Sequence, residues 1–176
     1  MKSPGEAAAV PLTGAITNGT FCPQAQRRFV LIAAILASAL GFIDGSILAI
    51  AMPALRANLG ASLAEVQWIS NAYALTLSAM ILAGGAAGDR FGLRLAFVVG
   101  IALFILASLA CALAPNAGVL IAFRAIQGIG AAIMVPGSLA IIAKAYPKNE
   151  RGRAIGIWAA ASALTTALGP VLGGLV

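Results

Sequence analysis

Five long apolar segments, separated by short polar stretches, constrain this chain more than any other feature of its sequence. An α-helix rises about 1.5 Å per residue, so about 20 apolar residues can cross the ~30 Å hydrocarbon core of a bilayer. The sequence therefore predicts an all-α integral membrane protein. The expected helices cover about residues 29–52, 66–87, 95–114, 118–143 and 154–176.

The N-terminal stretch, residues 1–28, mixes Pro, Gly, Thr and Asn without helical periodicity, and we expect a disordered tail there. The remainder, residues 29–176, would form one membrane bundle. Hydrophobic residues make up 61% of the chain and charged residues only 9%. Soluble domains contain about a quarter charged residues, and a soluble chain of this size could not bury so much apolar surface.

The chain has a net charge of +6, and its basic residues are distributed unequally between the two sides of the expected membrane topology. One side would carry most of the basic residues, the opposite side only Arg56, and Arg124 would lie inside a helix. This positive-inside asymmetry predicts a multi-pass protein of the plasma (inner) membrane with a cytoplasmic N-terminus. Basic residues are not interleaved with aromatic ones, so we expect no nucleic-acid partner. The residues on the basic side are Lys2, Arg27, Arg28, Arg90, Arg94, Lys144, Lys148, Arg151 and Arg153.

Enzymatic and metal chemistry have little support in this composition. The chain has no histidine, and its two cysteines, Cys22 and Cys111, do not form a Cys-x-x-Cys pair. Paired carboxylates and a nucleophile-elbow pattern are absent from the sequence as well. We therefore expect neither an enzyme nor a metal site nor a cofactor.

Asp44 lies inside the first apolar segment, where a carboxylate costs about 2.5–3.5 kcal/mol on insertion scales. Such a group should face a cavity or a partner, and it suits a proton-exchange role; a purely structural, neutralised carboxyl is the alternative. Arg124 is the candidate partner, because helix rise places both residues at similar depth. The alternative for Arg124 is that its side chain extends to the outer interface. Arg124, Gln127, Gly128 and Ala131 form a polar, small-residue stripe, which favours a helix contact or a cavity.

A charged turn joins the second and third apolar segments. Gly-x-x-x-Asp-Arg-x-Gly-x-Arg over residues 85–94 predicts a tight hairpin loop at the cytoplasmic face, although an ordinary positive-inside loop would have similar composition. The spacing resembles the loop between helices 2 and 3 of the major facilitator superfamily of secondary transporters. Ala87 and Leu93 depart from that pattern. The matching residues are Gly85, Asp89, Arg90, Gly92 and Arg94.

The last two apolar segments contain further matches. Leu120-x-x-x-Arg124-x-x-Gln127-Gly128 resembles the helix-4 motif of this superfamily, whose arginine is implicated in proton transfer. In the fifth segment, glycines four apart and a proline predict close packing and a kink, with generic packing as the alternative. This pattern resembles the antiporter motif of helix 5, although Thr165 replaces a glycine. Its residues are Gly156, Gly169, Pro170, Gly173 and Gly174.

Together with segments 67–73 and 147–156, these motifs most resemble the fourteen-helix drug:proton antiporter branch, of EmrB/QacA type. The resemblance implies proton-coupled efflux of drugs or amphipathic metabolites, with the proton gradient as energy source. Asp44, Arg124 and Gln127 would couple proton entry to substrate release. The 85–94 loop would stabilise one access state, and the helix-5 motif would seal the substrate cavity.

In that family the substrate lies between two six-helix halves. We therefore expect the chain to be an N-terminal fragment of such a transporter, with about five helices of the first half. Its expected partners are the lipid bilayer, protons, an amphipathic substrate and the missing C-terminal helices. We expect no transport by the 176 residues alone. A non-transporting fragment, a small protein acting through helix association, and a transporter of one specific metabolite remain alternatives.

Overall fold

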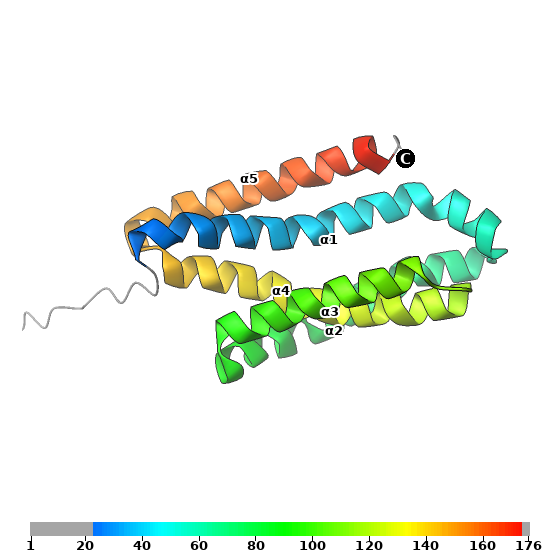
Figure 1. Cartoon of the computed structure of the whole chain (residues 1–176), viewed down its shortest axis with the longest axis horizontal. Coiled ribbons are helices and arrows are strands. Elements are labelled where there is room, and N and C mark those ends of the chain that lie inside the picture. Colours follow the sequence, from blue (N-terminus) through cyan, green and yellow to red (C-terminus); the bar gives the residue numbers. More distant parts are fainter. Residues whose placement is uncertain (1–22, 174–176) are drawn as a thin grey trace, which may run out of the picture.

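The computed structural model describes residues 23–173 as five α-helices that run along an elongated bundle (Figure 1). This confirms the predicted all-α class. The turn between α4 and α5 lies beside the start of α1, and the turn between α2 and α3 points toward the same end but is set back from it (Figure 1). The helices are α1 (Gln24–Leu59), α2 (Leu63–Phe91), α3 (Leu93–Ala112), α4 (Ala117–Ala145) and α5 (Lys148–Gly173).

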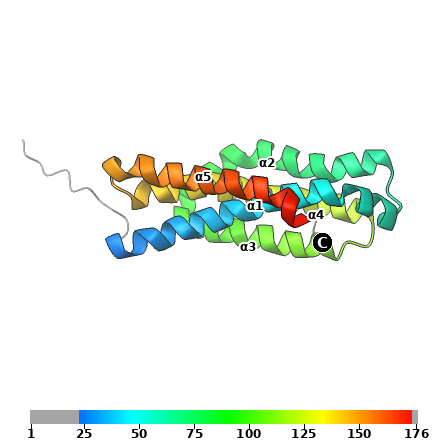
Figure 2. The ribbon, with the colours of Figure 1, turned by 90° about the horizontal axis from the view of Figure 1, so that it is seen from above.

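The fourth helix, α4, lies at the centre and contacts each of the other four helices. α5 instead packs mainly along α1, and the two views agree on this arrangement (Figures 1 and 2). α4 can occupy the centre because small residues line much of its surface. The buried small residues of α4 include Gly128, Gly130, Ala131, Ala132 and Gly137.

Two helix crossings depend on glycine. A Cβ atom at Gly128 would lie 2.6 Å from the Tyr73 carbonyl oxygen of α2, and one at Gly130 would lie 2.7 Å from the Phe104 nitrogen of α3. A Cβ at Gly84 would likewise overlap the Ala132 backbone of α4. The backbones of α2, α3 and α4 therefore approach more closely than any side chain would allow, as in other small-residue membrane interfaces.

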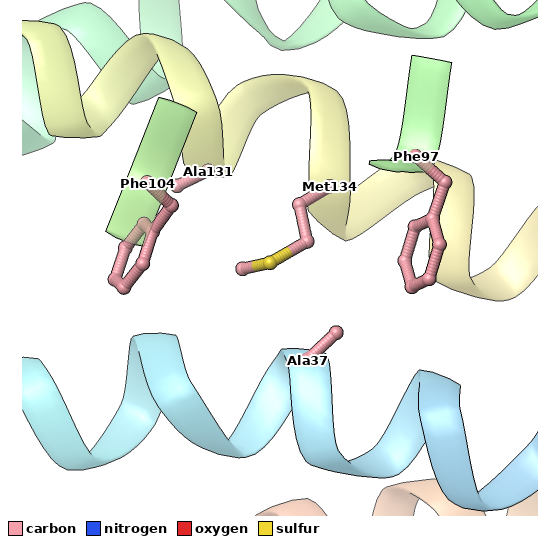
Figure 3. Close-up of a cluster of buried hydrophobic side chains, with 5 residues drawn as sticks. All are labelled: Ala37, Phe97, Phe104, Ala131 and Met134. Carbon is pink, nitrogen blue, oxygen red and sulfur yellow. The ribbon is translucent and has the colours of Figure 1, made fainter. Parts of the chain in front are cut away.

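A cluster of apolar side chains fills the space between α1, α3 and α4 (Figure 3). Met134 of α4 lies between the rings of Phe97 and Phe104, and its flexible thioether fills the gap above Ala37 of α1. Ala131 completes the cluster. This packing fixes the face that α1 presents to α4.

The first helix is longer than expected. α1 continues through Pro53 to Leu59, whereas the sequence analysis ended it at residue 52. A proline removes only one helical hydrogen bond, and near the end of a membrane span water can satisfy the freed carbonyl. The helix ends instead at Gly60, whose φ of 59° is left-handed and whose N–H donates to the Arg56 carbonyl.

The second helix begins earlier than expected, at Leu63 rather than at residue 66. Ser62 and Glu65 form a capping box: the Ser62 hydroxyl accepts from the Glu65 N–H, and the Glu65 carboxylate accepts from the Ser62 N–H at 2.8 Å. These two residues satisfy backbone donors that would otherwise be free.

The expected loop over residues 85–94 is almost entirely helical, which corrects that prediction. α2 runs to Phe91 and α3 begins at Leu93, so only Gly92 separates them. Its φ of 93° and ψ of 132° are accessible to glycine and strained for other residues. The hairpin is therefore a one-residue hinge.

The remaining boundaries also differ from the expected ones. α1 already begins at Gln24, so the end of the expected tail is helical, and residues 1–22 lie outside the described part. α3 and α4 cover residues 93–112 and 117–145 instead of 95–114 and 118–143. α5 begins at Lys148 rather than at residue 154.

Four of the described helices, α1 to α4, are long and apolar enough to cross a membrane. α5 begins with four charged residues among its first six, which lowers its apolar content within the described range. A fifth crossing therefore stays a prediction.

Neighbouring glycines on α2 test whether the α2–α4 contact stabilises the bundle. Gly84→Ala should destabilise the purified protein in detergent by about 1–3 kcal/mol, because the new methyl group overlaps the Ala132 backbone. Gly85→Ala is the matched control, since a Cβ at Gly85 meets nothing within 4 Å. It should be neutral or stabilising by about 0.5–1 kcal/mol. Equal thermal unfolding curves for the two variants would contradict the crossing.

Candidate functional site

The carboxylate of Asp44, on α1, contacts the guanidinium of Arg124 on α4. The Arg124 Nη1 donates to Asp44 Oδ2 at 2.6 Å. The two residues are 80 positions apart in sequence. The structure thus brings together the two residues that the helix rise per residue placed at a similar depth in the membrane.

Gln127 completes a closed triangle with these two residues. Its Nε2 donates to Asp44 Oδ1 at 2.8 Å, and its Oε1 accepts from Arg124 Nη1 at 2.6 Å. Because residues three apart on a helix lie on one face, Arg124 and Gln127 both reach α1 from α4. Each carboxylate oxygen of Asp44 therefore has its own donor.

Contacts from α2 complete the surroundings of Arg124. Its Nε donates to the Ile69 carbonyl at 3.3 Å, and its guanidinium carbon lies 4.6 Å from the centre of the Tyr73 ring. A guanidinium over an aromatic face is an attractive cation–π arrangement. Arg124 is only 4% exposed, so the alternative in which it extends to the outer interface is wrong.

Neither Ile69 nor Tyr73 was predicted from the sequence to be a site residue. They lie four residues apart, hence on one face of α2. Tyr73 could have been predicted as a site residue, because it is a tyrosine within an apolar helix. The Ile69 carbonyl offered no sequence signal, because a backbone contact depends on how closely α2 and α4 approach. Gly128, four residues after Arg124, permits that approach.

The three site side chains differ in accessibility. Gln127 is fully buried, Arg124 nearly so, and the Asp44 side chain is 19% exposed. Removing one partner from a buried pair leaves an uncompensated charge, which is strongly unfavourable. Asp44 has the most accessible side chain of the three.

The hairpin motif lies at the α2–α3 turn, toward the end of the bundle where α1 begins but set back from it (Figure 1). Asp89, Arg90 and Arg94 are exposed there, and the Arg90 guanidinium lies 5.8 Å from the Phe91 ring centre. Gly85 and Asp89 border a recess of about 160 Å³ between the hairpin and α4. The recess also contacts Gly88, Leu93, Pro136 and Gly137.

The helix-5 motif is described only in part. Gly156 is exposed, and a Cβ there would meet nothing within 4 Å, so no close crossing is present at this glycine among the described residues. The Thr165 hydroxyl donates back to the Ala161 carbonyl at 2.8 Å. Gly169, Pro170 and Gly173 belong to the α5 helix, but their surroundings are not described, and Gly174 lies outside the described residues.

A second polar contact, missed by the sequence analysis, links α1, α4 and α5. The Trp158 Nε1 of α5 donates to the Ser38 Oγ of α1 at 2.9 Å, and that Oγ lies 3.4 Å from Ser138 Oγ of α4. Both serines are buried. Within residues 23–173 no three metal-ligating side chains gather into a possible metal site.

Comparison with known proteins identifies the family. A family model described as Major Facilitator Superfamily matches residues 27–176. The Methylenomycin A resistance protein of Bacillus subtilis is 41% identical over 82% of this chain and 32% of its own length. The Tetracenomycin C resistance and export protein of Streptomyces glaucescens is 42% identical over 76% of this chain and 25% of its own length.

Among solved structures, a bacterial homolog of the human lysosomal transporter Spinster, inward-facing and unoccupied, superposes with a TM-score of 0.73 at 25% identity. It matches 88% of this chain and 32% of its own chain. The chain thus spans about a quarter to a third of the length of the proteins it matches. Since the family model covers most of the sequence, the chain belongs to the Major Facilitator Superfamily, a family of membrane transporters rather than enzymes.

Proposed function

We propose that this chain works as part of a longer transporter that exports drugs or other amphipathic metabolites in exchange for protons. The observation that carries the proposal is the Asp44–Arg124–Gln127 triangle inside a membrane bundle. Intramembrane ionisable groups that pair with one another are typical of ion and proton pathways. The names of the two relatives, which refer to antibiotic resistance and export, support the substrate class.

In the proposed cycle a proton binds one oxygen of the Asp44 carboxylate and removes its negative charge. Arg124 then loses its counter-ion, although its contacts with Gln127 and the Ile69 carbonyl persist. The attraction that holds α1 to α4 at this level weakens, and the guanidinium becomes available to another acceptor. A cationic substrate bound near Asp44 would compete with the proton for the same carboxylate.

The hairpin and helix-5 motifs have supporting roles in this proposal. The one-residue hinge at Gly92, with the exposed charges of Asp89, Arg90 and Arg94, would stabilise one access state against the remaining part of the transporter. The helix-5 motif, from Gly156 to Gly174, would seal the substrate cavity. The 85–94, helix-4 and helix-5 motifs, in this order and with Asp44 before them, support assignment to the fourteen-helix EmrB/QacA branch.

The distribution of charge supports a plasma-membrane protein with its N-terminus in the cytoplasm. Apart from the buried Arg124, the basic residues of the described chain lie toward the end of the bundle where α1 begins, and Arg56 lies at the other end. Positively charged loops are retained on the cytoplasmic side during insertion.

Asp44→Asn in the full-length protein should abolish proton-driven efflux while leaving membrane insertion intact. Asparagine keeps the shape and one acceptor oxygen but cannot exchange a proton at neutral pH. We would measure efflux of ethidium, a model amphipathic cation, from proteoliposomes with an imposed pH gradient. Ser46→Ala is the matched control, because Ser46 lies on the same helix and bonds only to the Phe42 carbonyl. Wild-type efflux by the Asp44→Asn variant would refute the coupling role.

The topology has its own test with a matched pair of exposed asparagines, Asn58 at the end of α1 and Asn149 at the start of α5. Each is changed to cysteine in a background lacking Cys22 and Cys111. A membrane-impermeant maleimide should label the Asn58→Cys variant in intact cells. It should label Asn149→Cys only after the membrane is permeabilised. The reverse pattern would place the N-terminus outside.

A further inference from the structure

The start of α1, the end of α4 and the start of α5 meet at one end of the bundle (Figures 1 and 2). We call the four residues Arg27, Tyr146, Glu150 and Arg151 the basic junction. The Tyr146 hydroxyl donates to the Arg27 carbonyl at 3.1 Å, and Arg27 Nη1 lies 3.4 Å from Glu150 Oε2. None of these residues belongs to the proposed coupling or gating motifs.

The two arginines of the basic junction lie on the packed faces of their helices. Ala34 of α1 and Ala154 of α5 belong to one buried cluster, against which Leu31 and Ile155 also pack. Arg27 is four residues before Leu31, and Arg151 is four before Ile155, so each lies one turn beyond this cluster on the same face. The Arg27 side chain is accordingly only 13% exposed.

Both arginines have a polar atom left without a partner. Among the described residues, the Nε atoms of Arg27 and Arg151 are the only buried side-chain nitrogen or oxygen atoms that lack a hydrogen bond. Buried polar groups in folded proteins almost always have partners, so each exception needs an explanation. Positive-inside topology explains exposed basic residues, but it does not explain why the Nε atoms of two arginines are buried without partners.

Electrostatics at this end of the bundle favours an anion. The N-terminus of a helix carries partial positive charge, which acidic groups stabilise and basic groups do not. α1 has no acidic residue in its first turn, and α5 has only Glu150. Glu150 is the only acidic residue within residues 24–31 and 144–155, which contain six basic residues: Arg27, Arg28, Lys144, Lys148, Arg151 and Arg153.

We propose that the basic junction binds the phosphate group of an anionic phospholipid. Arginine suits this ligand because its planar fork of N–H groups matches phosphate oxygens. Basic pockets between membrane helices at the cytoplasmic surface are a recognised way of holding acidic head groups. A phosphate here would supply acceptors to the two Nε atoms and negative charge to the two helix starts.

The neighbouring surface distinguishes a lipid from a free anion. One turn further along the bundle, Phe29 and Ile32 of α1 and Ile157 of α5 are exposed and apolar. They can contact the acyl chains of a lipid whose head group lies at the basic junction. A soluble phosphate would gain nothing from these side chains.

The test compares lipid binding by the full-length protein and two variants. Delipidated protein is titrated with phosphatidylglycerol or phosphatidylcholine, and bound lipid is counted by native mass spectrometry. Wild type should prefer phosphatidylglycerol, and the double variant Arg27→Gln/Arg151→Gln should lose roughly tenfold in apparent affinity, about 1.4 kcal/mol. Arg94→Gln is the matched control, because Arg94 is an exposed basic residue at the same end but outside the junction. Its affinity should stay within about twofold of wild type.

A second measurement needs no variant and so does not depend on whether the double variant folds. A photoactivatable phosphatidylglycerol is cross-linked to the wild-type protein, and the modified peptides are mapped. Labels should fall on the starts of α1 and α5 rather than on the α2–α3 hairpin. Labels on the hairpin alone, or equal lipid binding by the double variant, would overturn the proposal.

The last measurement is a competition between inorganic phosphate and bound phosphatidylglycerol. If inorganic phosphate displaces phosphatidylglycerol at similar concentration, the site recognises a free anion and the lipid assignment is wrong. Because none of these measurements involves transport, failure of the lipid site and failure of the efflux proposal are distinguishable.

Discussion

Burial of the Arg124 guanidinium is the constraint on which the bundle depends. A charged side chain inside a membrane bundle needs a counter-ion and acceptors for its N–H groups. Arg124 obtains them from three helices: Asp44 on α1, Gln127 on its own helix and the Ile69 carbonyl on α2. The positions of α1 and α2 relative to α4 are therefore linked at this single level.

Small residues on α4 make that arrangement possible. Gly128 lets the α2 backbone approach at Tyr73, and the aromatic ring then lies over the guanidinium. A larger residue at position 128 would move α2 away, and both the Ile69 and the Tyr73 contacts would lengthen. The glycine is thus part of the site although it offers no functional group. The same helix approaches α3 through Gly130, so α4 serves as the common support for the charged triangle and for the apolar cluster around Met134.

The strongest of these contacts could be predicted from the sequence, whereas the contacts that depend on helix packing could not. Asp44 and Arg124 were predictable because intramembrane charges need partners and helix rise gives their depths. Ile69 was not, because the approach of α2 to α4 depends on pairs of residues from both helices. The helix ends were misplaced because apolar content reports the bilayer core, whereas helices extend beyond it. The capping box of Ser62 and Glu65 was visible in the sequence and would have placed the start of α2 correctly. The α5 motif beyond Ala167 remains a prediction from resemblance.

Polar contacts along α1 join it to α4 and α5. Asp44 meets α4, Ser38 meets Trp158 of α5 and Ser138 of α4, and Arg27 meets Glu150 of α5 and Tyr146 at the end of α4. All of these contacts are made by one continuous helix, and α5 has far less contact with α4 than with α1. A displacement of α1 caused by protonation of Asp44 would therefore carry α5 with it, and it would have to break the Ser138 and Tyr146 contacts with α4. In the proposed transporter, the carboxylate would act on the α1–α5 pair as a unit, and a lipid phosphate at the basic junction would oppose that movement by holding the two helix starts together.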